Sequence, residues 1–423
     1  MAESRAKVSA ARLAAFEILK LVGQGKGHSD ELLHSGLTDA LSPEDRNLAT
    51  ALVMGVLRWQ IALDARVRGL LQRPEQKLAE AVSIALRMGA FQLLHMDRIP
   101  AHAALSESVE LCRAAGEPHA TGMVNAVLRK VAAAQKPKER IFESVAAFAE
   151  RLGHPQWMVE RWVGAYGRDA ALKICEADQQ EHGEGGMFAG GELAEGDLPT
   201  DGLPQMDDGS RLVAEIAAAA MPGAQRVWDC CAAPGGKTLI LAMRLGEAEV
   251  LASDVSAKRL AQMQSRMRRH AYAARVKCAV ADAGEEKNVR GEFDLILCDV
   301  PCSGTGTLAG NPEIRHMLRV EELQRQSDRQ KKILRGALQR LAPGGRLVYS
   351  TCSLEPEECE QVVDEVVAGT GLRRVPVEGF IAGLAAAGLL RSDLGSAVRD
   401  GALRTLPGVH GCDGFFAVVL GRD

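Results

Sequence analysis

The chain contains 423 residues, of which 47% are hydrophobic and 25% are charged, a composition typical of a globular protein with two or three domains. Its formal net charge of −4 excludes nucleic-acid binding through overall basicity, so any such function has to depend on local groups of basic residues. The ten cysteines contain no CxxC pair, which argues against a zinc site and a secreted disulfide framework.

The first twelve residues, MAESRAKVSAAR, lack the apolar stretch of a signal peptide, and no apolar run reaches membrane-spanning length. We therefore expect a cytoplasmic protein with reduced thiols, no bound metal and no membrane partner. We also expect a monomer.

Residues 1–135 predict an all-helical domain. Ser42 is a candidate helix cap, Pro43 fits the first turn and Asp45 supplies a carboxylate there. The apolar residues that follow recur at helical spacing, at Leu48, Leu52, Val56 and Trp59. Because similar apolar spacing recurs further along this region, we expect a compact helical bundle.

The next two segments differ sharply in composition. Residues 136–175 continue the helical pattern and are predicted to form a connector. Residues 176–210 contain ten Asp or Glu, no Lys or Arg, and many glycines. Such a sequence cannot bury enough apolar surface to fold alone, so we expect an acidic, glycine-rich linker.

From residue 211 to the C-terminus, strand and helix patterns alternate. The expected strands are 226–229, 248–253, 275–280, 293–299, 345–350 and 414–420. This alternation predicts an α/β domain with a doubly wound, largely parallel sheet. In such a sheet, sites are built in the crevice at the carboxyl ends of the strands.

A glycine-rich turn follows the first expected strand, in RVWDCCAAPGGKT (226–238), and leads into a helix near Lys237. Such a turn lets the backbone approach a ligand and presents free N–H groups at the helix start. Asp254 and Asp282 end the next two strands, where carboxylates can accept hydrogen bonds from a ribose and an adenine edge. The pattern predicts a site for a nucleoside that carries an amino-acid tail.

Two alternatives compete with this cofactor site. The glycines can serve chain geometry alone, with the Asp residues as helix caps. The GGKT sequence also resembles the end of a phosphate-binding P-loop, but that motif needs glycine at position 231, which is Cys. The absence of GxGxxG argues against a dehydrogenase.

Two cysteines follow strands in loop-like, polar surroundings: Cys302 in FDLILCDVPCSGTG (293–306) and Cys352 in GRLVYSTCSLEPEE (345–358). Most free cysteines are apolar fillers, but these surroundings favour reactive thiols. Methylation of cytosine C5 requires a thiolate to add at C6, and a base must later remove the C5 proton. An acid near N3, such as Asp299, would stabilise charge that develops on the ring. The residues alone do not say which thiol attacks.

The motifs DCCAAPGGKT, DVS (254–256), DVPCSGTG and STCSLEPEE resemble those of the Sun-type RNA cytosine-5 methyltransferases, which use S-adenosylmethionine. The helical region, especially LVMGVLRW (52–59) and VNAVLRKV (124–131), resembles the NusB-like RNA-binding domain of the bacterial branch that methylates 16S ribosomal RNA. The resemblance covers nearly the whole chain except residues 176–210. It implies a Rossmann-like class I methyltransferase sheet at 211–423 and a NusB-like domain at 1–135.

The resemblance also assigns roles to individual residues. Cys352 would be the nucleophile and Cys302 would assist release of the product. The residues implied to bind S-adenosylmethionine are Cys231, Ala232, Ala233, Pro234, Gly235, Gly236, Lys237, Asp254, Asp282 and Asp299. The expected function is methyl transfer to C5 of a cytosine in RNA, most consistent with 16S ribosomal RNA. Transfer RNA or another RNA is an alternative substrate, and a non-catalytic RNA-binding assembly factor is an alternative function.

Some features depart from the family pattern or leave a choice open. The family usually has a basic β module where this chain has its acidic linker, and Ala309, Gly310 and His316 replace a basic pair and an aromatic residue. Basic residues gather in AKRLAQMQSRMRRH (257–270) and between Arg315 and Arg335. Each group is either a solvated helix face or a contact for RNA phosphates.

Overall fold

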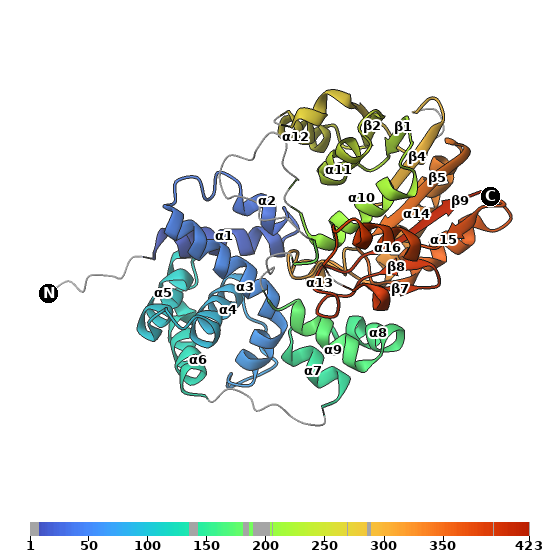
Figure 1. Cartoon of the computed structure of the whole chain (residues 1–423). Coiled ribbons are helices and arrows are strands. Elements are labelled where there is room, and N and C mark those ends of the chain that lie inside the picture. Colours follow the sequence, from blue (N-terminus) through green and yellow to red (C-terminus); the bar gives the residue numbers. More distant parts are fainter. Residues whose placement is uncertain are drawn as a thin grey trace. The chain divides into compact units, whose positions relative to one another are not determined.

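The computed structural model describes residues 8–134, 143–180, 186–188, 204, 206–268, 270–285, 289–391 and 393–422. Contacts divide the chain into two compact units (Figure 1). The helical unit contains Met1–Glu181 and Leu308–Met317, and the sheet unit contains His182–Thr307 and Leu318–Asp423. The chain therefore leaves the sheet unit at residue 308 and returns to it at residue 318.

The N-terminal part of the helical unit is entirely helical in its described residues, as expected. Its helices are α1 (Ala10–Gly23), α2 (Ser29–Leu33), α3 (Pro43–Arg68), α4 (Glu80–His95), α5 (Ala101–Ala114), the 3-10 helix η1 (Pro118–Ala120) and α6 (Thr121–Ala133). Helix α3 begins as predicted, because the side chain of Ser42 accepts a hydrogen bond from the Asp45 N–H at 3.1 Å. Leu52 and Val56 are buried in the core of this unit.

Helix α3 is also long and apolar enough to cross a membrane by length and composition alone. The expectation that no segment reaches that length is therefore wrong for this helix. However, 44% of its most apolar window is buried inside the structure, and core helices commonly pass the same test. Leu52, Val53 and Leu57 contribute to the core rather than to an exposed apolar surface.

Three further helices follow in the described part of the connector: α7 (Val145–Arg151), α8 (Gln156–Tyr166) and α9 (Arg168–Ala177). Of the expected linker at 176–210, most residues lie outside the described ranges. Its end is helical instead, since α10 (Asp208–Ala220) starts three residues before the boundary expected at 211. Asp207 caps this helix through hydrogen bonds from the N–H groups of Gly209 (2.7 Å) and Ser210 (3.2 Å).

The segment Leu308–Met317, which ends in α13 (Ile314–Met317), belongs to the helical unit. The side chain of Arg315 is only 2% exposed and donates hydrogen bonds to the carbonyl oxygens of Arg58 (3.1 Å), Gly153 (3.2 Å) and Asp178 (3.3 Å). Burial lowers the pKa of Arg315 to about 10, so it remains a cation at neutral pH. This segment is therefore held by a buried charge whose terminal N–H groups donate to backbone carbonyls, while its Nε has no hydrogen-bond partner among the described residues.

Neighbouring residues of the same segment make further contacts within the helical unit. The buried carboxylate of Glu313 accepts a hydrogen bond from the Ser29 hydroxyl at 2.9 Å. Nε2 of His316 lies 2.7 Å from the Leu57 carbonyl oxygen, and burial lowers the pKa of His316 to about 4. His316 is therefore a neutral ring that donates to the backbone.

The sheet unit contains one mixed sheet of nine strands in its described residues. The strand order is β3 (Val276–Val280), β2 (Glu249–Asp254), β1 (Arg226–Asp229), β4 (Phe293–Asp299), β5 (Leu341–Thr351), β9 (Phe416–Gly421), β8 (Ala402–Arg404) and β7 (Val398–Arg399), with β6 (Arg373–Val375) also paired to β9. Strands β1 to β5 pair in parallel, and β9 runs antiparallel to β5. The predicted α/β fold class is confirmed, whereas β6, β7 and β8 were not expected.

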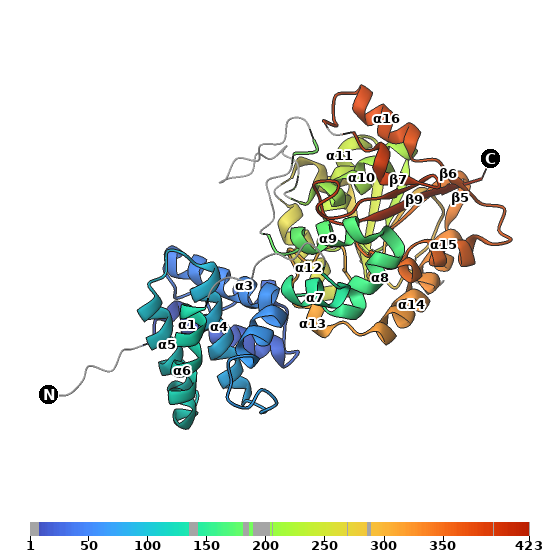
Figure 2. The ribbon, with the colours of Figure 1, turned by 90° about the horizontal axis from the view of Figure 1, so that it is seen from below.

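Helices cover both faces of the sheet (Figure 2). Alternate residues of β4 belong to two apolar cores: Leu295 and Leu297 share one with α10, α11 (Gly236–Arg244) and α16 (Glu378–Ala386). Ile296 and Cys298 share the other with α14 (Val320–Leu338) and α15 (Glu360–Val367). Because successive strand residues point to opposite faces, this is the doubly wound arrangement. Helix α12 (Ala257–Met267) and the short helices η2 (Ala271–Arg275), η3 (Pro356–Glu358) and η4 (Gly395–Ala397) complete the unit.

The strand order reverses direction between β1 and β4. From β1 the chain moves outward through β2 to β3, and it then returns to place β4 on the other side of β1. Ligands bind at such a switch point, outside the carboxyl ends of the strands. Strand β1 ends at Asp229 and β4 at Asp299, so these two residues mark the expected crevice.

Candidate active site

A pocket of about 420 Å³ opens at this switch point. Its lining contains the whole predicted cofactor loop, Cys231 to Lys237, together with Asp299. Asp229, Ser210 and Arg266 also line it, although none of the three was predicted to bind the cofactor. The volume lies in the range of pockets that hold cofactors and other small molecules.

The turn of the cofactor loop requires glycine at position 235. Its φ angle is +105°, a conformation that other residues rarely adopt. A Cβ atom at this position would also lie 2.8 Å from Cγ of Met263. The Gly-rich sequence therefore serves the close approach of the loop to α12, and α11 begins at the next residue, as predicted.

Lys237 and Asp299 form an ion pair in the pocket. Lys237 Nζ lies 2.8 Å from Asp299 Oδ2 and donates a second hydrogen bond to the Ser210 hydroxyl at 2.7 Å. Burial alone would lower the pKa of Lys237, but the facing Asp299 carboxylate favours the charged form, and as a result the pKa of Lys237 is raised. Asp299 Oδ1 also accepts a hydrogen bond from Ser350 at 2.7 Å. Both oxygens of Asp299 therefore have partners, and Lys237 is held as a cation.

Asp229 places a carboxyl group with an unused acceptor in the pocket wall. The residue is 1% exposed, and its Oδ2 accepts a hydrogen bond from Thr238 at 2.6 Å. Its Oδ1 has no hydrogen-bond partner among the described residues. An unsatisfied buried acceptor is costly, so this wall fits a ligand that brings N–H or O–H donors, such as an amino-acid tail.

Replacement of Asp229 by asparagine should change how stability depends on pH. Burial is the main reason that the pKa of Asp229 rises from its ordinary 3.8 to about 7. Between these values the folded protein holds a proton that the unfolded chain releases, so this carboxyl makes the free energy of unfolding fall as pH rises. Asp229→Asn should flatten that fall, measured as urea midpoints across this pH range. Asp400→Asn, at an exposed carboxylate, is the control, and an unchanged slope in Asp229→Asn would contradict the assignment.

Asp254 and Asp282 are not among the residues that line the pocket. Asp254 ends β2 as predicted, but its Oδ1 accepts from the Ser256 N–H at 2.8 Å and its Oδ2 lies 3.4 Å from Arg259. Asp282 lies two residues beyond β3 and accepts from the Gly284 N–H at 2.8 Å. Both carboxylates accept hydrogen bonds from nearby backbone N–H groups. Such contacts are what the alternative interpretation predicts, in which these residues only cap a helix or a turn.

The two loop cysteines lie side by side. Cys302 is three residues beyond β4 and Cys352 directly follows β5, and the two strands are neighbours in the sheet. Their sulfur atoms are 3.3 Å apart, and both residues are partly exposed. Hydrogen bonding to Cys352, together with burial, raises the pKa of Cys302 well above its ordinary value. Cys302 is therefore held as a neutral thiol beside the Cys352 sulfur.

Glu358 connects the two cysteine loops through hydrogen bonds to both of them. This fully buried carboxylate accepts hydrogen bonds from the Ser303 N–H at 2.9 Å, the Gln330 side chain at 3.0 Å and the Ser353 hydroxyl at 2.6 Å. Its other contact with Ser303 is to the side-chain hydroxyl. Because Ser303 follows Cys302 and Ser353 follows Cys352, Glu358 fixes the separation of the two sulfur atoms. Sequence reasoning missed this role, since STCSLEPEE offers three glutamates and no signal that one turns inward.

Gly306 provides a second connection between the same loops. Its N–H donates to the Cys352 carbonyl oxygen at 2.9 Å, and its own carbonyl oxygen accepts from the Gly414 N–H at 2.8 Å. A Cβ atom here would lie 2.2 Å from the Gly414 carbonyl oxygen. Only glycine allows this close approach of three backbone segments.

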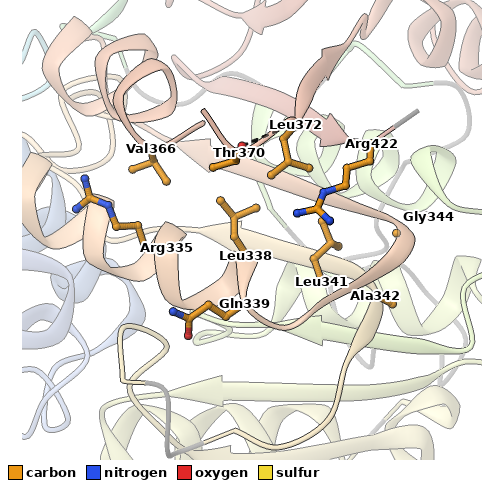
Figure 3. Close-up of a pocket in the computed structure, with 11 residues that line it drawn as sticks. Arg335, Leu338, Gln339, Leu341, Ala342, Gly344, Val366, Thr370, Leu372 and Arg422 are labelled. Carbon is orange, nitrogen blue, oxygen red and sulfur yellow. Dashed lines mark hydrogen bonds between the residues drawn. The ribbon is translucent and has the colours of Figure 1, made fainter. Parts of the chain in front are cut away.

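A larger cavity of about 500 Å³ lies at the amino end of β5 (Figure 3). Apolar side chains from α14 and β5, including Leu338 and Leu341, line it together with Arg335 and Arg422. Arg335 is paired with Glu365 at 3.0 Å. The lining contains no thiol, carboxylate or histidine, and Cys352 follows the opposite end of the same strand. This cavity is therefore not the candidate active site.

Comparisons with known proteins agree on both parts of the chain. Residues 218–421 match the family model described as 16S rRNA methyltransferase RsmB/F, and residues 9–133 match the NusB family. A ribosomal RNA small subunit methyltransferase B from Xanthomonas campestris is 33% identical, with 99% of this chain and 98% of that protein covered. A probable ribosomal RNA small subunit methyltransferase B from Bacillus subtilis is 30% identical, with 97% and 98% covered. The crystal structure of PH0851 shares the fold over 99% of this chain and 100% of that one, with a TM-score of 0.73 at 21% identity.

Proposed function

Because the chain belongs to the RsmB/F family of 16S rRNA methyltransferases and carries a NusB-family domain, we propose that it methylates C5 of one cytosine in 16S ribosomal RNA through a cysteine adduct. It is an S-adenosylmethionine-dependent RNA cytosine-5 methyltransferase, as its family is. The covalent route and the residue roles below are proposals, as are a cytoplasmic location and a monomeric state.

The observation that carries the proposal is the pair of thiols, 3.3 Å apart, at the ends of adjacent strands. Asp299, which ends the first of these strands and forms an ion pair with Lys237, also lines the pocket at the switch point. An adduct at C6, a methyl donor and a base for the C5 proton are all needed at one pyrimidine ring. The two loops can supply the thiols, and the pocket can bind the methyl donor.

The cofactor would lie along the loop from Cys231 to Lys237, with the Asp229 acceptor in the wall behind it. S-adenosylmethionine supplies an electrophilic methyl group when bound. Asp254 and Asp282 are assigned to it only by the family resemblance. Asp254 would have to exchange its contact with Arg259 for ribose hydroxyls, because both of its oxygens already have partners.

The proposed reaction begins when the Cys352 thiolate forms a bond to C6 of the target cytosine and electron density moves to C5. The Lys237 cation, paired with Asp299, would offset negative charge on the ring near N3. When the Cys352 sulfur is bonded to C6, Cys302 loses the hydrogen bond that is the main cause of its raised pKa. After C5 gains the methyl group, Cys302 would release its own proton to water, and its thiolate would take the C5 proton while the C6–sulfur bond breaks.

Bisulfite sequencing of total RNA from cells with and without this protein tests the substrate. We expect one cytosine of 16S ribosomal RNA to lose its C5 methyl group without the protein and to regain it when the wild-type chain, but not Cys352→Ala, is restored. A methyl group lost from transfer RNA would instead favour the alternative substrate. No change in any RNA would favour a non-catalytic assembly factor.

A further inference from the structure

The sequence contains two basic groups that are candidate RNA contacts, and the structure shows that they differ in how many of their cations are ion-paired. In the group from Arg315 to Arg335, Arg315 is buried in the helical unit, and most of the others lie on α14 beside acidic residues. The ion pairs are Arg325 with Glu322, Lys331 and Arg335 with Glu365, and Lys332 with Glu285. Four cations of this group are therefore paired within the protein, whereas Arg319 and Arg329 have no acidic partner within 4.0 Å among the described residues.

The group on α12 is different. Leu260, Met263 and Met267 bury one face of this helix, and Lys258, Arg266 and Arg268 are exposed. None of these three cations has an acidic partner within 4.0 Å among the described residues, and residues 257–270 contain no Asp or Glu. Among the described cations of this group, only Arg259 has an acidic partner, Asp254 at 3.4 Å.

The basic helix α12 lies next to the candidate active site. Arg266, Met267 and His270 line the pocket at the switch point, so the C-terminal end of the helix borders the pocket in which the methyl donor would lie. A target cytosine must leave its stack to reach such a pocket, and its flanking phosphates then need counter-charges close by. In a chain with a net charge of −4, three exposed cations on α12 and its C-cap, one of which lines the pocket, form a local concentration of positive charge.

We propose that the exposed cations of α12 and its C-cap, Lys258, Arg266 and Arg268, bind the phosphodiester backbone of the substrate RNA next to the target nucleotide. The proposal rests on the RNA methyltransferase function. It commits to RNA phosphates because point cations without acidic partners provide sequence-independent contacts to a polyanion. The paired cations of α14 are assigned to stabilising contacts within the protein instead.

The test compares two full-length variants with equal loss of charge. Lys258→Gln/Arg268→Gln removes two unpaired cations of α12 and leaves the pocket-lining Arg266 in place. Arg325→Gln/Lys332→Gln removes two paired cations of α14. The probe is fluorescein-labelled 16S ribosomal RNA transcript, titrated at several salt concentrations. Each phosphate contact on single-stranded RNA contributes about 0.7 to the slope of log affinity against log salt.

We expect the α12 variant to reduce that slope by about 1.4 and to raise KM for RNA, with kcat and the calorimetric affinity for S-adenosylmethionine unchanged. The α14 variant should bind RNA as the wild type does. Equal slopes in both variants would overturn the proposal, and so would weaker cofactor binding in the α12 variant, since α12 would then serve the cofactor. A wild type that neither binds nor methylates RNA would instead contradict the proposed function.

Discussion

Replacement of Cys352 by alanine should abolish methyl transfer to RNA, with a loss of at least about 10⁴-fold in kcat/KM. Without the sulfur at this position, no bond to C6 can form and C5 of the aromatic ring stays unreactive. Binding of S-adenosylmethionine should persist, because Cys352 does not line the pocket that holds the predicted cofactor loop. Transfer of a labelled methyl group and calorimetry measure the two quantities.

Cys278→Ala is the matched control for this variant. Cys278 is another partly exposed free thiol of the sheet unit, on β3, and it does not line the pocket. Its removal should leave methyl transfer close to that of the wild type. Retained activity in Cys352→Ala, combined with lost activity in Cys302→Ala, would reverse the proposed roles of the two thiols.

Replacement of Cys302 by alanine should trap the enzyme on its RNA. The first steps need only Cys352, so the adduct forms and the methyl group is transferred. Without the base 3.3 Å away, the C5 proton remains and the carbon–sulfur bond cannot break. We expect turnover to stop after about one methyl group per enzyme molecule. The complex should survive denaturing electrophoresis.

The double variant Cys302→Ala/Cys352→Ala provides the control, since it lacks the attacking sulfur and should give no such complex. A Cys302→Ala enzyme that turns over normally and forms no stable complex would show that another group removes the proton. Glu358 is not a candidate for that role, because its carboxylate is fully buried and occupied by the serines that follow the two cysteines.

Strong local signals made much of the fold predictable. The Ser42 cap with Pro43 marked the start of α3, and the apolar run 293–299 matches β4 residue for residue. Strands β6, β7 and β8 have only two or three residues each, which is too short for any periodic pattern. Strands β6 and β8 form by pairing with β9, and β7 forms by pairing with β8, and this information is tertiary.

The candidate site was predictable where residues follow strand ends. The loop thiols and the glycine-rich turn have that signal, and the structure brings the thiols to within 3.3 Å. Asp254 and Asp282 have the same signal, yet both make local backbone contacts outside the pocket lining. Asp229 also ends its strand, but no sequence signal shows that its carboxyl group is buried with an unused acceptor.

The segment Leu308–Met317 has a consequence for any attempt to isolate the catalytic part. A fragment that began at α10 would include this segment without the helices that satisfy it. The Arg315 guanidinium would lose the carbonyls of Arg58, Gly153 and Asp178, and Glu313 would lose Ser29. A buried charge without partners costs several kcal/mol, so the segment would unravel into water. The segment Leu308–Met317 is joined directly to the Cys302 loop. We therefore expect that the sheet unit cannot keep this loop in place without the N-terminal helices.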